Sequence, residues 1–428
     1  MGASSSACCV SSAPSIPFGD NSPWKGAILN PTLSVLSSHK ESVTCCIVSD
    51  CGSYFASAGS DGQVLVSNRN NPHFSLSHIS SVSWPHSTPC PEEYDPNDIS
   101  HFGVFDISIL AMSRPNSPSP VLLSGSTHNA VRSWDLKTGK IINLYTNFQG
   151  TVTSLQFSFE DPNVFLFTND PGSDTFPSIV AVCSVRGKDI RRRNFGLSGL
   201  RACWTRNNNK VIVAGHEGGV PRMYLWDPFK NTFTKHDVSL KVPVSSVELA
   251  LLGDGQAFAC RWEVENLDAS YNLPSWESFY IYSVNNCALL KTVSVCSNSS
   301  FIDSSFPYQF VSSRLNSSFG LGVFTSVGPV SLFLGENPND NSSLVEFNLS
   351  EVAVLSSCTL LAMSLPHRIC IISNDSQVEV RSLSSELSLL YCLKHQSNVK
   401  CVTACISDST ANVMLGYSDG SVKVLSVS

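Results

Sequence analysis

One short stretch, residues 122–140, most constrains how this chain can fold. It is LLSGSTHNAVRSWDLKTGK. Residues 121–126 and 130–134 alternate like half-buried strands, and the polar residues between them predict a tight turn. The pair Trp134 and Asp135 closes the second strand, and residues 140–145 continue as a third. The stretch therefore predicts a small antiparallel sheet.

The same strand and turn rhythm recurs along the chain. A Ser-Asp-Gly turn between two apolar runs occurs at residues 60–62 and again at 418–420, and a second Trp-Asp pair stands at Trp226 and Asp227. This pattern resembles the WD-repeat family, whose repeat of about 40–45 residues forms four strands. The resemblance implies an all-β fold, a single closed β-propeller of four-stranded blades.

The resemblance also implies a role for three polar residues of the first repeat. His39, Ser57 and Asp61 match the family's buried hydrogen-bonded set, whereas Ser67 stands where the family has Trp. A histidine in such a set could also be a ligand or a catalytic base. We favour the structural role, because Asp61 would fix the tautomer of His39 and satisfy both groups inside the blade.

The number of blades stays open at seven or eight, because the repeat signal weakens over residues 294–350. We expect residues 1–30 to form a flexible tail rich in Ser, Cys and Pro, and residues 31–428 to form the propeller. The outer strand of the first blade is predicted at 73–79. The last repeat ends after its third strand, so we expect the strand at 32–36 to complete the last blade.

Composition narrows the class of protein. Charged residues make up 14% and hydrophobic residues 42%, which is too apolar for a disordered chain. No apolar run approaches the roughly 18 residues of a membrane helix. The net charge of −7 argues against direct nucleic-acid binding. The 16 cysteines form no C-x-x-C pair, so we expect free thiols, no metal and no cofactor.

The amino terminus carries one short motif. Met1 to Ser6 match the M-G-x-x-x-[ST] myristoylation pattern at Gly2, and Cys8 and Cys9 follow as candidates for palmitoylation. Two lipid chains give the stable anchoring that one does not. We expect a cytoplasmic or nuclear protein that is bound to a membrane only if this terminus is acylated.

Catalytic motifs are missing from the sequence: it contains no phosphate-binding G-x-x-x-x-G-K-[ST], no H-E-x-x-H and no G-x-S-x-G. We therefore predict a non-enzymatic scaffold that binds proteins within a complex. Two alternatives stay open. One is a substrate receptor of a cullin-type ubiquitin ligase, because residues 134–137 are close to the W-D-x-R of some family members. The other is an enzyme with a site in the central channel.

A partner surface is predicted from the loops. In the family, the connections between blades share a face with the turns between second and third strands. When the charged residues are sorted by this rule, that face is predicted to be acidic. The opposite side of blades two to four is predicted to be basic. Aromatic residues lie among the carboxylates, which suits a basic partner segment that also needs aromatic anchors. The candidate partner-binding residues are Trp84, Glu92, Glu93, Tyr94, Glu263, Glu265, Tyr271 and Trp276.

Overall fold

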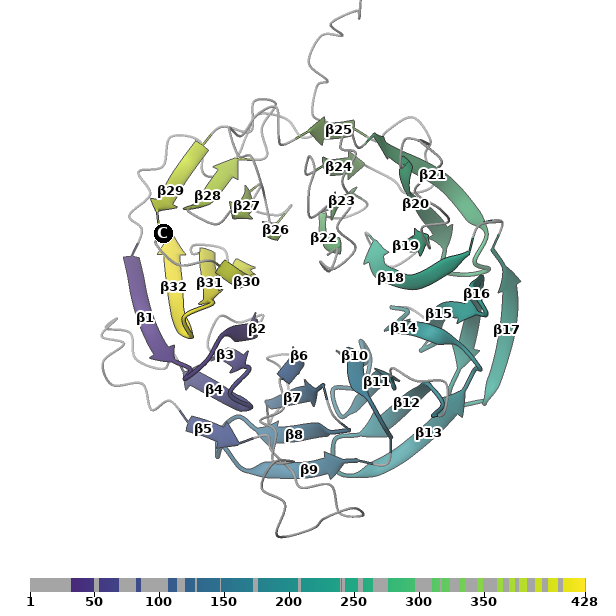
Figure 1. Cartoon of the computed structure of the whole chain (residues 1–428), viewed down its shortest axis with the longest axis horizontal. Helices are drawn as coiled ribbons and strands as arrows, with labels where there is room; N and C mark the ends of the chain where they lie inside the picture. Colours follow the sequence, from purple (N-terminus) through teal and green to yellow (C-terminus); the bar gives the residue numbers. More distant parts are fainter. Residues whose placement is uncertain are drawn as a thin grey trace, which may run out of the picture.

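The computed structural model is a ring of antiparallel sheets (Figure 1). It describes residues 32–49, 54–68, 82–85, 107–113, 120–127, 129–146, 148–171, 176–206, 209–238, 240, 243–252, 257–264, 276–296, 310–315, 318–323, 331–335, 345–348, 360–364, 369–373, 377–382, 389–394, 399–406 and 411–427. In these residues there are eight sheets of four strands each, which decides between seven and eight blades. The described residues include no helix of the length and apolar character that crossing a bilayer requires.

The first four blades follow the chain in order, each from its inner to its outer strand. Blade 1 contains β2 (Val43–Val48), β3 (Tyr54–Gly59), β4 (Gln63–Asn68) and β5 (Val82–Pro85). Blade 2 contains β6 (Ile107–Met112), β7 (Val121–Ser126), β8 (Val131–Asp135) and β9 (Ile141–Tyr145). Blade 3 contains β10 (Thr151–Phe157), β11 (Val164–Asp170), β12 (Ile179–Ser184) and β13 (Lys188–Asn194). Blade 4 contains β14 (Ser198–Trp204), β15 (Val211–Glu217), β16 (Val220–Asp227) and β17 (Thr232–Asp237).

The remaining blades keep the same strand order. Blade 5 contains β18 (Val244–Leu252), β19 (Ala257–Val264), β20 (Trp276–Ser283) and β21 (Leu289–Cys296). Blade 6 contains β22 (Phe310–Leu315), β23 (Ser318–Val323), β24 (Ser331–Gly335) and β25 (Val345–Asn348). Blade 7 contains β26 (Leu360–Ser364), β27 (Ile369–Ser373), β28 (Gln377–Ser382) and β29 (Leu389–Lys394). Blade 8 contains β30 (Val399–Ile406), β31 (Ala411–Tyr417), β32 (Ser421–Val427) and β1 (Thr32–Ser38).

The ring closes by the predicted exchange of a strand. The strand β1, at the start of the chain, pairs antiparallel with β32, at its end, so that Leu33 lies opposite Leu425. The innermost strands contact one another in sequence from β2 to β30, and β30 in turn contacts β2. Blade 8 is therefore held by both ends of the described chain, and the outer edge of β32 is covered.

The core lies between blades, because each sheet packs on a neighbour through both of its faces. All six residues of β7 are buried, so the predicted half-buried alternation of residues 121–126 is wrong, because this strand is covered on both sides. Alternate residues of β15 pack in two directions: Val211 and Val213 join a cluster with blade 3, whereas Ile212 joins one with blade 5. The outer strand of a blade is the last strand of its sheet and lies at the rim of the ring. The outer strand β17 is almost entirely exposed.

Two details of the predicted strands need correction. The outer strand of blade 1 is β5 and not the segment 73–79, which lies outside the described residues. Trp84 therefore belongs to a strand, opposite Val64 of β4, and not to a loop. In blade 5, β19 extends through Glu263, and β20 begins at Trp276. Outer strands pair on one edge only, so their sequences carry a weak signal.

Candidate functional site

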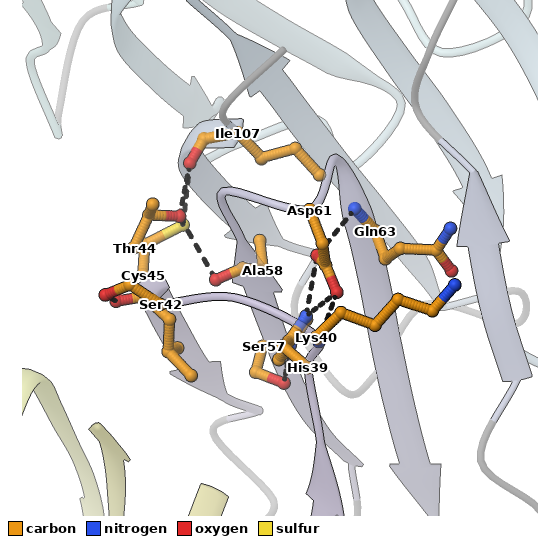
Figure 2. Close-up of polar contacts among 11 residues, drawn as sticks. His39, Lys40, Ser42, Thr44, Cys45, Ser57, Ala58, Asp61, Gln63 and Ile107 are labelled. Carbon is orange, nitrogen blue, oxygen red and sulfur yellow. Dashed lines mark hydrogen bonds and ion pairs between the residues drawn. The ribbon is translucent and has the colours of Figure 1, made fainter. Parts of the chain in front are cut away.

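Ser57, His39 and Asp61 form the predicted polar cluster in blade 1 (Figure 2). The ring Nδ1 of His39 lies 3.0 Å from Oδ1 of Asp61, and Nε2 lies 2.9 Å from Oγ of Ser57. The carboxylate can only accept, so Nδ1–H donates to Asp61, and the hydroxyl of Ser57 donates to Nε2. This order of hydroxyl, imidazole and carboxylate is also that of a hydrolase triad.

Burial decides between the two roles of this cluster. Ser57 is 1% exposed and the side chain of His39 is 0% exposed, so a substrate cannot reach the hydroxyl. Asp61 also accepts hydrogen bonds from the backbone N–H of Lys40, at 2.9 Å, and of Gln63, at 3.1 Å. The cluster therefore ties the entry of blade 1 to its Ser-Asp-Gly turn, which is a structural function.

Other blades keep only parts of this cluster. In blade 2, the indole Nε1 of Trp134 donates to Oγ of Ser124 at 2.8 Å. In blade 4, Val213 takes the position that Ser124 has in blade 2. Ser124 lies opposite the residue two positions before Trp134, and Val213 lies opposite the residue two positions before Trp226. Nε1 of Trp226 has no hydrogen-bond partner among the described residues. Valine supplies no acceptor, which explains the difference.

Hydrogen bonds between blades define one face of the ring. The carbonyl of Gly420, in the turn before β32, accepts from N–H of His39 at 2.8 Å, and the carbonyl of Gly219, before β16, accepts from N–H of Val244 at 2.8 Å. Gly420 has a φ of +81°, and a Cβ there would lie 2.3 Å from the carbonyl oxygen of His39. We call this side, with the turns between second and third strands and the connections between blades, the connection face.

The structure places three of the predicted partner-binding residues beside the connection face. Trp84 is near the end of β5, next to the turn at residues 60–62. Glu263 and Trp276 flank the link between β19 and β20. The other predicted residues lie outside the described part of the chain: Glu92, Glu93, Tyr94, Glu265 and Tyr271, and also the lipidation candidates Gly2, Cys8 and Cys9.

These residues fall into two separate groups. Trp84 belongs to blade 1, and Glu263 and Trp276 belong to blade 5. The contacts between inner strands put four steps between these blades in either direction, and Figure 1 shows β5 and β20 on opposite sides of the ring. The fold does not bring the two groups together, so one short partner segment cannot touch both.

Two exposed apolar side chains on the connection face were not predicted from the sequence. Phe176, before β12, is 46% exposed, and Val220, at the start of β16, is 47% exposed. They lie after the second strands of adjacent blades, 3 and 4. Their sequence signal is an apolar residue beside Pro177 and Gly219, in turns where polar residues are usual.

The face opposite the connection face carries both signs of charge in blades 2 to 4. The predicted basic residues that are described lie in its turns or beside them: Lys137, Lys140, Arg186, Lys188, Arg206, Lys210 and Lys230. Acidic residues accompany them because tight turns need acceptors. Asp135 accepts from N–H of Lys137 and Thr138, and Asp227 accepts from N–H of Phe229 and Lys230. The predicted basic field is therefore weakened by its own turns.

The remaining chemistry in the described part of the chain is modest. It contains no group of three His, Cys, Asp or Glu side chains placed to hold a metal ion. Cys203, Cys260 and Cys287 are free thiols. Burial raises the pKa of Cys203 and of Cys287 to about 12, so both stay protonated and are weak nucleophiles at neutral pH.

Comparison with known proteins agrees with this geometry. The family model described as "WD domain, G-beta repeat" matches residues 30–66, which include β1, β2, β3 and most of β4. The ring built from such units decides the identification. The chain is a β-propeller, and its residues 30–66 are similar to a WD repeat. Its sequence repeat thus begins with the outer strand of one blade and ends with the third strand of the next.

Solved WD-repeat and propeller structures share the fold at low sequence identity. The Dos1 propeller is 13% identical with a TM-score of 0.62, and the match covers 96% of this chain and 97% of that one. Saccharomyces cerevisiae Sqt1 is 11% identical with a TM-score of 0.62, covering 93% and 99%. The RRP9 WD40 repeats are 12% identical with a TM-score of 0.53, covering 92% and 97%. No curated protein matches the sequence.

Proposed function

We propose that this WD-repeat propeller is a non-enzymatic scaffold whose connection face holds partner proteins in a complex. WD-repeat propellers generally bind other proteins. The observation that carries the proposal is the exposed pair Phe176 and Val220, because apolar side chains on neighbouring turns of a rigid ring suit a protein interface. The burial of Ser57 supports the non-enzymatic part, since the triad-like cluster has no access to substrate.

We propose that the partner carries basic residues and that it contacts the aromatic side chains of this chain. Glu92 and Glu93 would serve one side of the ring, and Glu263 and Glu265 the other. Because Trp84 and Glu263, described residues of the two groups, lie on opposite sides of the ring, we propose a partner that presents two basic segments or a domain wide enough to span the connection face. Association should slow as salt is raised, because exposed charges steer encounter.

Cross-linking of the full-length protein in cells, followed by mass spectrometry, tests the proposal. The double variant Phe176→Ser/Val220→Ser should lose the cross-linked partners. The matched control is Leu289→Ser/Leu389→Ser, which changes side chains that are 42% and 51% exposed on the outer strands of blades 5 and 7. Equal capture by both double variants would contradict the role of the connection face.

Charge reversal tests the two acidic groups separately. We expect Glu92→Lys/Glu93→Lys and Glu263→Lys/Glu265→Lys each to weaken capture, and their combination to abolish it while the urea midpoint stays unchanged. Loss of capture with only one pair reversed would place the partner on one side of the ring. Unchanged capture in the combined variant would exclude the basic partner.

Membrane attachment is a separate part of the proposal. If Gly2 is acylated, with Cys8 and Cys9 supplying further chains, Gly2→Ala should move the protein from the membrane fraction to the cytoplasm or nucleus. An intact mass that shows an unmodified or acetylated amino terminus would contradict this. The ligase-receptor alternative gains no specific support, because Trp134 is buried and only Lys137 of residues 134–137 is exposed.

A further inference from the structure

The outer strands of blades 3 and 4, β13 and β17, lie side by side on the rim of the ring (Figure 1). Each is the last strand of its sheet, so its outer edge has no strand partner among the described residues. The backbone N–H and C=O groups of such an edge can pair with an added strand. This rim surface is distinct from the connection face and independent of the function proposed for it.

An arginine is held rigidly between these two strands. The guanidinium of Arg193, in β13, lies 3.9 Å from the ring centroid of Phe233 in β17 and 5.4 Å from that of Phe195. The two rings meet edge to face at 6.0 Å. A guanidinium over the face of a ring can still present its N–H edges, which suits bidentate binding of a carboxylate.

The surroundings of Arg193 are basic although the chain as a whole is acidic. Strand β13 has four basic residues and one acidic residue in the sequence KDIRRRN, whereas the whole chain carries −7. Asp189 pairs with Arg192 at 2.9 Å. Among the described residues, no ion pair uses Arg191 or Arg193. Arg191 is exposed and lies on the same side of β13 as Arg193, because alternate residues share a face.

The apolar part of this surface selects a peptide over a nucleic acid. Phe233 is 45% exposed, so part of the ring can contact an apolar side chain. Arg193 covers one face of that ring, which leaves less of the ring for stacking a base. Charged residues also protect free strand edges from wrong pairing, but edge protection does not require an arginine stacked between two rings.

We propose that the β13–β17 rim binds an extended, acidic segment of a partner protein as a fifth strand of blade 3. The main chain of the segment pairs with the edge of β13, its Asp or Glu side chains bind Arg191 and Arg193, and an apolar side chain contacts Phe233. Two surfaces of the ring then hold partners: the connection face and this rim.

Selection from a displayed library of random 12-residue peptides tests the proposal with a defined probe. The full-length protein is the target, and the variant Arg191→Glu/Arg193→Glu is used for counter-selection. We expect peptides rich in Asp and Glu that lose at least tenfold in affinity for this variant. Lys137→Glu, an exposed charge reversal in blade 2, is the matched control and should bind these peptides like the unmodified protein.

Arg193→Lys separates a stacked guanidinium from simple positive charge. It keeps the charge but lacks the planar fork, so we expect a loss of about tenfold, equal to about 1.4 kcal/mol. Equal urea midpoints show that each variant is folded. The proposal is overturned if no peptide distinguishes the protein from Arg191→Glu/Arg193→Glu, if the distinguishing peptides are not acidic, or if oligouridine RNA binds the rim and acidic peptides do not.

Discussion

Blades 1 and 4 hold the same four-stranded sheet together by different means. Blade 1 has the hydrogen-bonded set of His39, Ser57 and Asp61 but has Ser67 where the family has Trp. Blade 4 has Trp226 but, among the described residues, no acceptor for its indole N–H, and its aromatic side chains pack on one another instead. Phe195 contacts the rings of Tyr224, Trp226 and Phe233.

The difference follows from position in the ring. Blade 1 meets the closing blade, where His39 donates to the carbonyl of Gly420, so directional hydrogen bonds set the register of two chain ends that are far apart in sequence. Blade 4 makes the equivalent bond, from N–H of Val244 to the carbonyl of Gly219, but it lies between blades that are continuous with it along the chain. Non-directional packing replaces the polar cluster inside this blade. A blade therefore tolerates the loss of the Trp when the polar His-Ser-Asp set is present. It also tolerates the loss of the polar set when aromatic packing replaces it.

The largest effect is expected from removing the closing strand. A chain that lacks residues 1–38 loses β1 and exposes the edge of β32. We expect its thermal midpoint to fall by roughly 5 °C or more. A chain that lacks residues 1–30 keeps β1 and should melt like the full chain in the same calorimetric experiment. Equal midpoints for both truncations would contradict closure by β1.

Asp61→Ala tests how much the polar cluster stabilises blade 1. It leaves the ring N–H of His39 and two backbone N–H groups without their acceptor, so we expect a loss of about 2–4 kcal/mol in the free energy of unfolding. Glu217→Ala, in the corresponding turn of blade 4, removes an exposed carboxylate paired with Arg222 and should cost less than about 1 kcal/mol. Urea unfolding measures both, and similar losses would remove the distinction between the blades.

Two Trp→Phe variants compare the indole groups directly. Trp134→Phe removes the hydrogen bond to Ser124, whereas Trp226→Phe removes an N–H that has no partner among the described residues. The loss of packing is similar in both, so we expect Trp134→Phe to cost about 1 kcal/mol more in the free energy of unfolding. The reverse order in urea unfolding would show that blade 4 supplies an acceptor.

The smallest expected effect is a coupling. Val213→Thr places a hydroxyl where blade 2 has Ser124, within the register that would let Trp226 donate to it. We expect a double-mutant cycle with Trp226→Phe to give a favourable coupling of about 1 kcal/mol between Thr at 213 and the indole. A coupling near zero would mean that Trp226 does not face this position.

Sequence patterns predicted the inner strands and the closure because both rest on strong local signals. Residues 54–59 are mostly apolar and are followed by a Ser-Asp-Gly turn, and the strand at 32–36 had no blade of its own. The outer strand of blade 1 was misplaced because β5 is short and pairs on one edge. The sequence could not show that Trp84 and Trp276 lie across the ring from each other, since that depends on the number of blades between them.

We propose that the Ser57–His39–Asp61 cluster supports the fold and that partner binding resides on the surface. Cross-linked partner capture by Ser57→Ala, measured beside its urea midpoint, tests this most directly. Ser57 is buried, so a substrate cannot reach it. We therefore expect Ser57→Ala to have a lower urea midpoint and to capture partners as well as the unmodified protein at a temperature where the variant is folded. An unchanged midpoint with lost capture would contradict it, because Ser57 would then act in function and not in stability.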